Sequence, residues 1–209
     1  MARFSTYADL RDGIAKTLAR SDLTDDIPAF VALAETRISR DLRVRWMEQR
    51  SQAITEGGTS WLDVPADFLE ARRFVLKTTP NRNLTFLSPA DLVAAYGGRS
   101  GMPQNYSILG QQFELGPMPD AAYPVELIYY ASLAPLDDAM RPSNWCLIRY
   151  PDLYLYGALI ETAPFLKEDE RLATWLGLYD RAVAAIKGED ARAKYNGAPL
   201  AMRLDMRVG

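Results

Sequence analysis

The sequence contains no histidine and a single cysteine, Cys146. Without histidine the chain lacks the commonest general base, the usual serine and cysteine triads, and the imidazole ligand of metal sites. One cysteine excludes an internal disulfide and fits a reducing compartment. Because Cys146 lies between Trp145 and Leu147, we expect an inert core thiol and not a nucleophile.

Other signals of catalysis are missing as well. There is no Ser-x-x-Lys arrangement, no phosphate-binding loop and no dinucleotide fingerprint. The acidic pairs Asp25-Asp26, Asp137-Asp138 and Glu189-Asp190 are better interpreted as caps at turns and helix starts than as metal ligands. Paired carboxylates can meet in space alone, so a small soluble hydrolase that uses acidic residues stays open as an alternative. We expect no enzymatic activity, no cofactor and no metal.

Charge and hydropathy exclude two further classes of partner. The formal net charge of −3 gives no global basic field to gather nucleic acid. No apolar run approaches a membrane span, and the first residues form no apolar signal region. We therefore expect a soluble protein made in a cytoplasm. At 209 residues, with a 48% hydrophobic share, it is one large domain or one domain with an insert.

Two helices are expected at the start of the chain. Thr6 is a good N-cap, and Asp9 completes an approximate capping box. Pro28 marks the start of a second helix, and both helices carry an apolar stripe. The stripes consist of Leu10, Ile14 and Leu18, and of Ile27, Phe30, Val31, Ala34 and Ile38.

An excess of arginine follows the second stripe. It comprises Arg37, Arg40, Arg43, Arg45 and Arg50. We interpret it as a solvated or inter-subunit face, since no aromatic platform for nucleic acid is interleaved with it.

The stretch Asn144–Leu166 is expected to form the central core helix. Pro151 suits the first helical position, and Asp152 follows at the positive end of the helix dipole. Leu153–Ile160 carries no charge, so this helix should be buried on all sides, and Pro164 should kink or stop it. The candidate core residues are Trp145, Tyr156, Leu159, Ile160 and, in a later helix, Trp175.

The middle of the chain has short apolar runs separated by glycine and proline. Glu56–Thr59 indicates a hairpin between Met47–Thr55 and Ser60–Val64. Further strands are expected at Glu70–Lys77, Asn83–Leu87, Asn105–Leu109, Phe113–Leu115 and Val125–Ala131, with a turn at Thr79–Arg82 and a short helix between Ser88 and Gly97. In the last strand Leu127, Tyr129 and Ala131 share one face, and Ile128 and Tyr130 the other.

A final amphipathic helix carries its apolar residues on one face as far as Ile186 and is expected to continue to Tyr195. The face consists of Leu172, Trp175, Leu176, Tyr179, Val183 and Ile186. The expected fold class is α+β: an antiparallel helix bundle (1–44 and 143–195), an inserted small antiparallel β module with one short helix (45–136), and an extended C-terminal tail (196–209).

Several sequence blocks, in order along the chain, resemble the head-to-tail adaptor proteins of tailed bacteriophages. They are Arg20–Leu23, Ile27–Glu35, Arg40–Arg43, Met47-Glu48, Leu62–Phe68, Leu115–Pro119, Leu127–Ala131, Asn144-Trp145 and Pro151–Leu159. The resemblance implies a structural virion protein of the neck, assembled in the host cytoplasm, with no catalytic residues. It also implies a homo-oligomeric ring, usually of twelve subunits, that binds the portal protein and a tail tube or nozzle protein. DNA would pass through its channel without lasting contact, and no membrane is involved. Another neck component, a stopper or tail-completion ring, is the alternative within the same class.

The C-terminal tail is the candidate portal-docking segment. Apolar residues alternate there with polar ones, as in a strand that adds to a sheet edge or lies in a groove. The candidate docking residues are Leu200, Met202, Arg203, Leu204, Met206, Arg207 and Val208.

Overall fold

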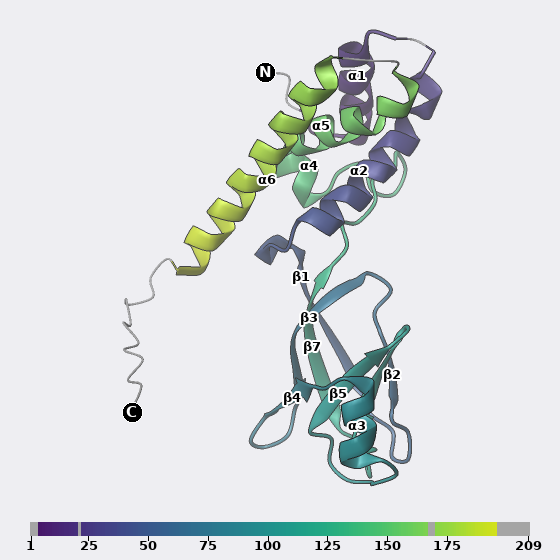
Figure 1. Cartoon of the computed structure of the whole chain (residues 1–209), viewed down its shortest axis with the longest axis vertical. Helices are drawn as coiled ribbons and strands as arrows, with labels where there is room; N and C mark the ends of the chain where they lie inside the picture. The colour runs from purple at the N-terminus through teal and green to yellow at the C-terminus, as the bar shows by residue number, and fades with distance from the viewer. Residues whose placement is uncertain (1–3, 21, 167–169, 196–209) are drawn as a thin grey trace.

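The computed structural model describes residues 4–20, 22–166 and 170–195. The molecule is elongated, with most of its helices at one end and a curled sheet at the other (Figure 1). The described part has six α-helices and seven strands, so the expected α+β class is confirmed. The antiparallel bundle arrangement of the helices stays a prediction.

The helical part is built from five of the α-helices. They are α1 (Tyr7–Leu18), α2 (Ile27–Asp41), α4 (Trp145–Arg149), α5 (Pro151–Glu161) and α6 (Arg171–Tyr195), with short 3₁₀ turns at Thr24–Asp26, Arg45–Met47 and Ala163–Phe165. Both expected apolar stripes are buried, and α6 continues to Tyr195. None of the helices in the described ranges is both long and apolar enough to cross a membrane.

The predicted cap of α1 is confirmed in detail. The Thr6 hydroxyl accepts the Asp9 N–H at 3.1 Å, and the Asp9 carboxylate accepts the Thr6 N–H at 3.1 Å. This reciprocal pair satisfies two backbone donors that a helix start leaves open.

The central stretch differs from the single helix that we expected. Asn144 caps α4, the helical conformation is interrupted at Tyr150, and α5 begins at Pro151. The physical reason is that Pro151 disfavours a helical conformation of the preceding residue. The new helix contacts α1, α2, α4 and α6, yet Leu155 and Tyr156 are only partly buried. The expectation of burial on all sides was therefore wrong.

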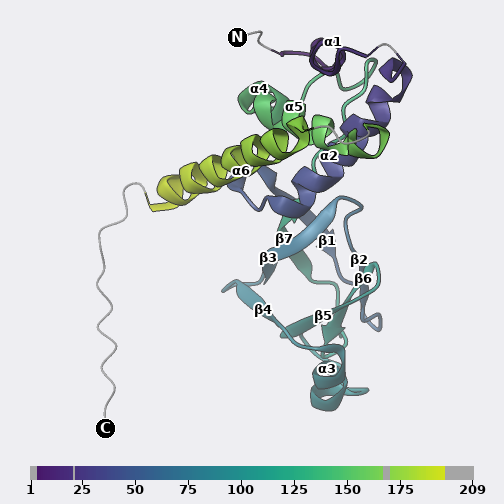
Figure 2. The ribbon, with the colours of Figure 1, turned by 45° about the horizontal axis from the view of Figure 1, so that its top comes forward.

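The strands form one curled sheet in the order β1-β7-β3-β4-β5-β6-β2. They are β1 (Glu48–Ile54), β2 (Trp61–Asp63), β3 (Phe68–Leu76), β4 (Arg82–Phe86), β5 (Asn105–Leu109), β6 (Gln112–Gly116) and β7 (Pro124–Ala131), and α3 (Pro89–Tyr96) packs beside β5 and β6. The expected strand positions and the helix after Ser88 are confirmed. Figure 2 shows the sheet below the helices, with α3 at the far end.

One predicted pairing in the sheet was wrong, and so was the expectation of a wholly antiparallel module. β1 does not pair with β2: it pairs with β7, and β2 pairs with β6. The reason is that Thr55 is held by the loop before β7, where its N–H donates to the Tyr123 carbonyl at 2.9 Å and its hydroxyl donates to the Ala121 carbonyl at 3.0 Å. The module is also not wholly antiparallel, since β4 and β5 run parallel across a connection that contains α3.

Strand β7 connects two hydrophobic cores. Leu127, Tyr129 and Ala131 lie in the core of the sheet, whereas Tyr130 lies in the core of the helical part. The predicted alternation is thus confirmed, and it shows how the sheet is anchored to the helices.

Candidate assembly interface

The described residues offer little for catalysis. Cys146 is fully buried, so its expected core position is confirmed, and burial raises the pKa of its thiol far above the ordinary value. Within the described ranges, no group of three or more acidic or cysteine side chains is placed to hold a metal ion. The notable polar side chains are instead those that join the sheet to the helices.

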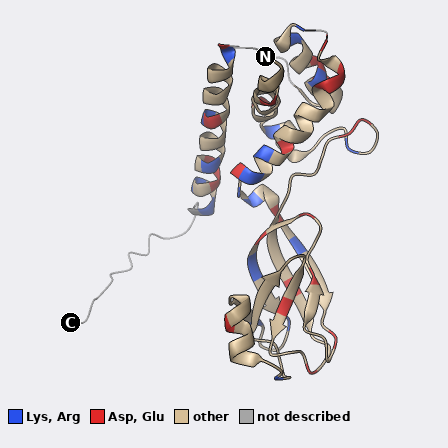
Figure 3. Cartoon of the chain, turned by 45° about the vertical axis from the view of Figure 1, so that its right-hand side comes forward, with Lys and Arg blue, Asp and Glu red and all other residues tan. Residues whose placement is uncertain are grey.

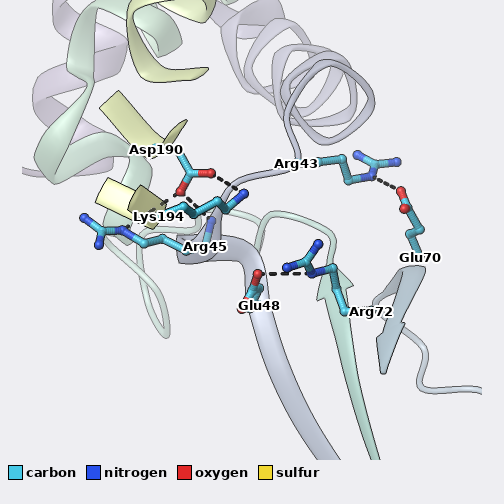
Figure 4. Close-up of polar contacts among 7 residues, drawn as sticks. All are labelled: Arg43, Arg45, Glu48, Glu70, Arg72, Asp190 and Lys194. Carbon is cyan, nitrogen blue, oxygen red and sulfur yellow. Dashed lines mark hydrogen bonds and ion pairs between the residues drawn. The ribbon is translucent and has the colours of Figure 1, made fainter. Parts of the chain in front are cut away.

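Two ion pairs lie at the junction of the sheet and the helical part (Figure 4). Arg43 Nε lies 3.3 Å from Glu70 Oε2, and Arg72 Nε lies 3.4 Å from Glu48 Oε1. Arg43 also donates to the Ser39 and Leu42 carbonyls at 2.6 Å, which satisfies carbonyls at the end of α2. Arg43 therefore caps the C-terminal end of α2 and links this helix to β3.

Asp190 of α6 is the third polar contact at this junction. Its carboxylate accepts the Arg45 N–H at 3.0 Å and the Lys194 ammonium at 2.6 Å. Burial works to raise its pKa, but the hydrogen bonds from Lys194 and the Arg45 backbone outweigh burial and lower the pKa. A charged Asp190 thus holds the end of α6 beside the segment that leads into β1 (Figure 4).

The return segment from β7 to α4 is fixed by buried polar side chains of α2. Ser39 accepts the Leu133 N–H at 3.0 Å, and Glu35 accepts the Leu136 N–H at 2.8 Å. Burial raises the pKa of Glu35, although hydrogen bonds from Leu136 and Tyr154 oppose the rise. The return segment is not part of a helix or a sheet at these positions, so the Ser39 and Glu35 side chains accept the backbone N–H groups that would otherwise lack a partner.

Asn144 completes this buried network. Its amide donates to the Ala134 carbonyl at 2.9 Å and to the Tyr154 hydroxyl at 2.6 Å. The Tyr154 hydroxyl in turn donates to Glu35 at 3.1 Å. Both connections between sheet and helices are therefore braced, and the molecule is suited to holding its two ends at a fixed separation.

The arginine excess is solvent-exposed, as expected: the side chains of Arg37, Arg43, Arg45 and Arg50 are 31–65% exposed. The inter-subunit alternative stays a prediction. Four of the five arginines form ion pairs inside the chain: Arg37 with Glu161, Arg43 with Glu70, Arg45 with Asp190 and Arg50 with Glu126. An aromatic ring also lies among them, since the guanidinium groups of Arg45 and Arg149 lie 5.4 and 3.9 Å from the centre of the Trp46 ring. Lysine and arginine are interspersed with aspartate and glutamate over both parts of the molecule (Figure 3).

Exposed apolar side chains occur on both parts. On the sheet and α3 they are Ile54, Trp61, Phe86, Val93 and Leu109; on the helical part they are Leu33, Met140, Ile148, Phe165 and Leu176. Leu176 belongs to the predicted apolar face of α6 but is exposed. Met140 is 92% exposed at a turn that the Asp137 carboxylate holds by accepting the Ala139 and Met140 N–H groups.

The residues singled out from the sequence are placed as follows. Leu159, Ile160 and Trp175 are buried, and Trp145 and Tyr156 are partly buried. The portal-docking candidates from Leu200 to Val208 lie outside the described residues. The turn before β4 is exposed from Thr79 to Asn81, and the first two residues of β4, Arg82 and Asn83, are exposed as well. The sequence analysis did not identify Glu35 and Ser39, whose side chains hold the segment between β7 and α4.

The fold is thus braced at both connections between sheet and helices, and it carries exposed apolar side chains on both parts. The family model described as SU10 adaptor protein matches residues 5–203. The chain belongs to this family of structural phage adaptors, as the sequence resemblance indicated. A comparison with curated proteins found no match.

Proposed function

We propose that this chain forms a closed ring in the virion neck, joins the portal to the tail, and lets the genome pass through the channel. The observation that carries the proposal is the braced, two-ended architecture of an adaptor-family chain. One end presents helices and the other presents the sheet with α3, so two different partners can be held apart at a fixed distance.

A closed ring also requires two different lateral faces on each copy. In such a heterologous contact, one patch meets a different patch on the neighbouring copy. The interspersed charges (Figure 3) and the separate exposed apolar residues of the two parts provide such different patches. The mixed charge also suits a channel wall, because a surface meant to retain DNA would be strongly basic.

We further propose that the chain divides as its sequence indicates, into helices (1–44 and 143–195), sheet module (45–136) and tail (196–209). In this division the tail docks to the portal, and the sheet module meets neighbouring copies or the tail tube. The alternating apolar residues of the tail support its assignment, because an extended segment with one apolar side fits a groove or a sheet edge.

The test is attachment to the portal. Deleting Pro199–Gly209 should leave the purified chain folded and abolish co-sedimentation with portal particles. A control that replaces Ala201 and Asp205 with glutamine keeps the apolar alternation and every candidate docking residue, and it should retain binding. Normal attachment of the truncated chain would assign portal binding to the helices. Neighbouring proteins in an assembled particle distinguish an adaptor from a stopper ring.

A further inference from the structure

The outer edge of β1 is a long strand edge that no other described strand covers, although Glu48 and Arg50 place charges on this strand. β1 spans seven residues, whereas the opposite edge strand, β2, spans three and is followed closely by Pro65. Within the part of the chain that the structure describes, β1 pairs with β7 alone. Open edges of this length are templates for another strand, and monomers usually shorten, charge or cover them.

The backbone donors on this free edge can be assigned. Thr55 N–H donates to the Tyr123 carbonyl, in register with the pairing of β1 and β7. Backbone groups alternate sides along a strand, so the N–H groups of Ser51 and Ala53 also point to β7. The N–H groups of Arg50, Gln52 and Ile54 point to the open edge.

A small hollow beside this edge is lined mostly by apolar side chains, together with the polar side chains of Ser51 and Asp63. Ser51 and Ala53 of β1 lie on one side of the hollow and Leu62 of β2 on the other, with Phe113 and Leu127 among the remaining lining residues. Because residues two apart in a strand share a face, a strand added to β1 would direct every second side chain over this hollow. Its occupant should therefore be an extended segment with alternating apolar residues.

The end of α6 lies close to the start of β1. The Asp190 carboxylate accepts the N–H of Arg45, three residues before β1 begins at Glu48. Residues 196–209 follow α6; fully extended, they span at most about 46–50 Å. The seven residues of β1 span about 24 Å. The C-terminal segment is therefore long enough to reach β1 and to run along its whole length.

We propose that, in the unassembled subunit, residues 199–208 of the same chain add to the outer edge of β1 as a parallel strand. Leu200, Met202 and Leu204 then cover the hollow between β1 and β2, and the segment protects an edge that would otherwise pair with other chains. The portal attachment proposed above requires the segment to leave β1, so binding to the portal and exposure of this edge are linked.

Amide hydrogen exchange of the full chain, followed by NMR, tests this directly. The N–H groups of Arg50, Gln52 and Ile54 should exchange at least about tenfold faster after deletion of Pro199–Gly209. The N–H groups of Ser51 and Ala53 should stay protected in both chains, which also shows that the truncated chain is folded. Replacing Leu200, Met202 and Leu204 with glutamine should act like the deletion, whereas replacing Ala201 and Arg203 with glutamine should not.

Three results would overturn the proposal. The first is fast exchange of Gln52 in the full chain, and the second is protection that survives the truncation. The third is protection that increases with protein concentration, which would mean that a second copy covers the edge. All three are independent of the portal-binding assay, so failure here is distinguishable from failure of the proposed function.

Discussion

Gly157 of α5 faces Ala34 of α2 so closely that a Cβ atom on residue 157 would lie 3.2 Å from the Ala34 Cβ. On another side, the same atom would lie 3.5 Å from the Tyr179 ring of α6. α5 is thus held between two helices at a point where almost any side chain is too large. Close packing at this point fixes the position of α5 between α2 and α6.

Gly157→Leu should therefore destabilise the chain by about 1–3 kcal/mol, because overpacking forces α2 or α6 to shift. Urea unfolding followed by circular dichroism measures the change. Gly177→Ala is the matched control: a Cβ at Gly177 meets nothing within 4 Å, so this variant should be unchanged or up to about 1 kcal/mol more stable. Equal stabilities of the two variants would contradict the close packing of α5.

Leu159→Ala should cost about 2–5 kcal/mol, since Leu159 is 0% exposed in α5 and truncation leaves a cavity. Ile148→Ala in α4 serves as the control, because Ile148 is 59% exposed and should lose less than about 1 kcal/mol. Thermal unfolding of both variants checks the difference. An unchanged Leu159→Ala variant would mean that α5 is a docking surface.

Glu35 should make stability depend on pH. Burial raises its pKa in the folded state, so the folded chain binds this proton more tightly than the unfolded chain does. The resulting stabilisation is fully present below the unfolded pKa and is lost as pH rises through the raised folded value.

Glu35→Gln keeps an acceptor for the Leu136 N–H and removes the titration, so the wild-type chain should lose stability relative to this variant as pH rises across that window. Unfolding midpoints of both chains between about pH 4 and 8 measure the effect. If the midpoints of the two chains changed with pH in parallel, the pKa of Glu35 would be the same in the folded and unfolded chains, contrary to this prediction. Glu35→Ala should be destabilised by about 1–3 kcal/mol, since it leaves the Leu136 N–H unpaired.

The turn from Thr79 to Asn81 should matter for assembly and not for folding. It is exposed and precedes β4, which begins at Arg82, so a short glycine link in its place should leave the unfolding midpoint within a few degrees of the original. Ring formation or tail recruitment, followed by electron microscopy, should be weakened. Rings that form and recruit tails normally would show that the turn is merely a connector.

Local signals predicted most of the elements. Thr6 and Asp9 predicted the start of α1, and Pro28, Ser88 and Pro151 marked three other helix starts, because capping and proline geometry depend on neighbouring residues. The alternation of β7 also came from its own sequence. These features need no information about distant parts of the chain.

Pairings between distant segments could not be predicted in the same way. The turn at Glu56–Thr59 resembled a hairpin, yet Thr55 binds Ala121 and Tyr123, and such contacts are invisible to local turn chemistry. The contacts of Glu35 and Ser39 with the return segment likewise join distant parts of the chain. Glu35 lies four residues after Val31 and three before Ile38, and Ser39 lies four after Glu35, so the helical spacing that places them on the buried face of α2 was the available signal.

The central claim is that identical copies of this chain form a ring between portal and tail. Its most direct test is cryo-electron microscopy of the purified chain mixed with portal particles, with the mass of the added layer measured alongside. We expect one closed ring of this chain beneath the portal, with the helical and sheet ends facing different partners. A chain that stays monomeric beside unoccupied portals, or that attaches as scattered single copies, would contradict the account.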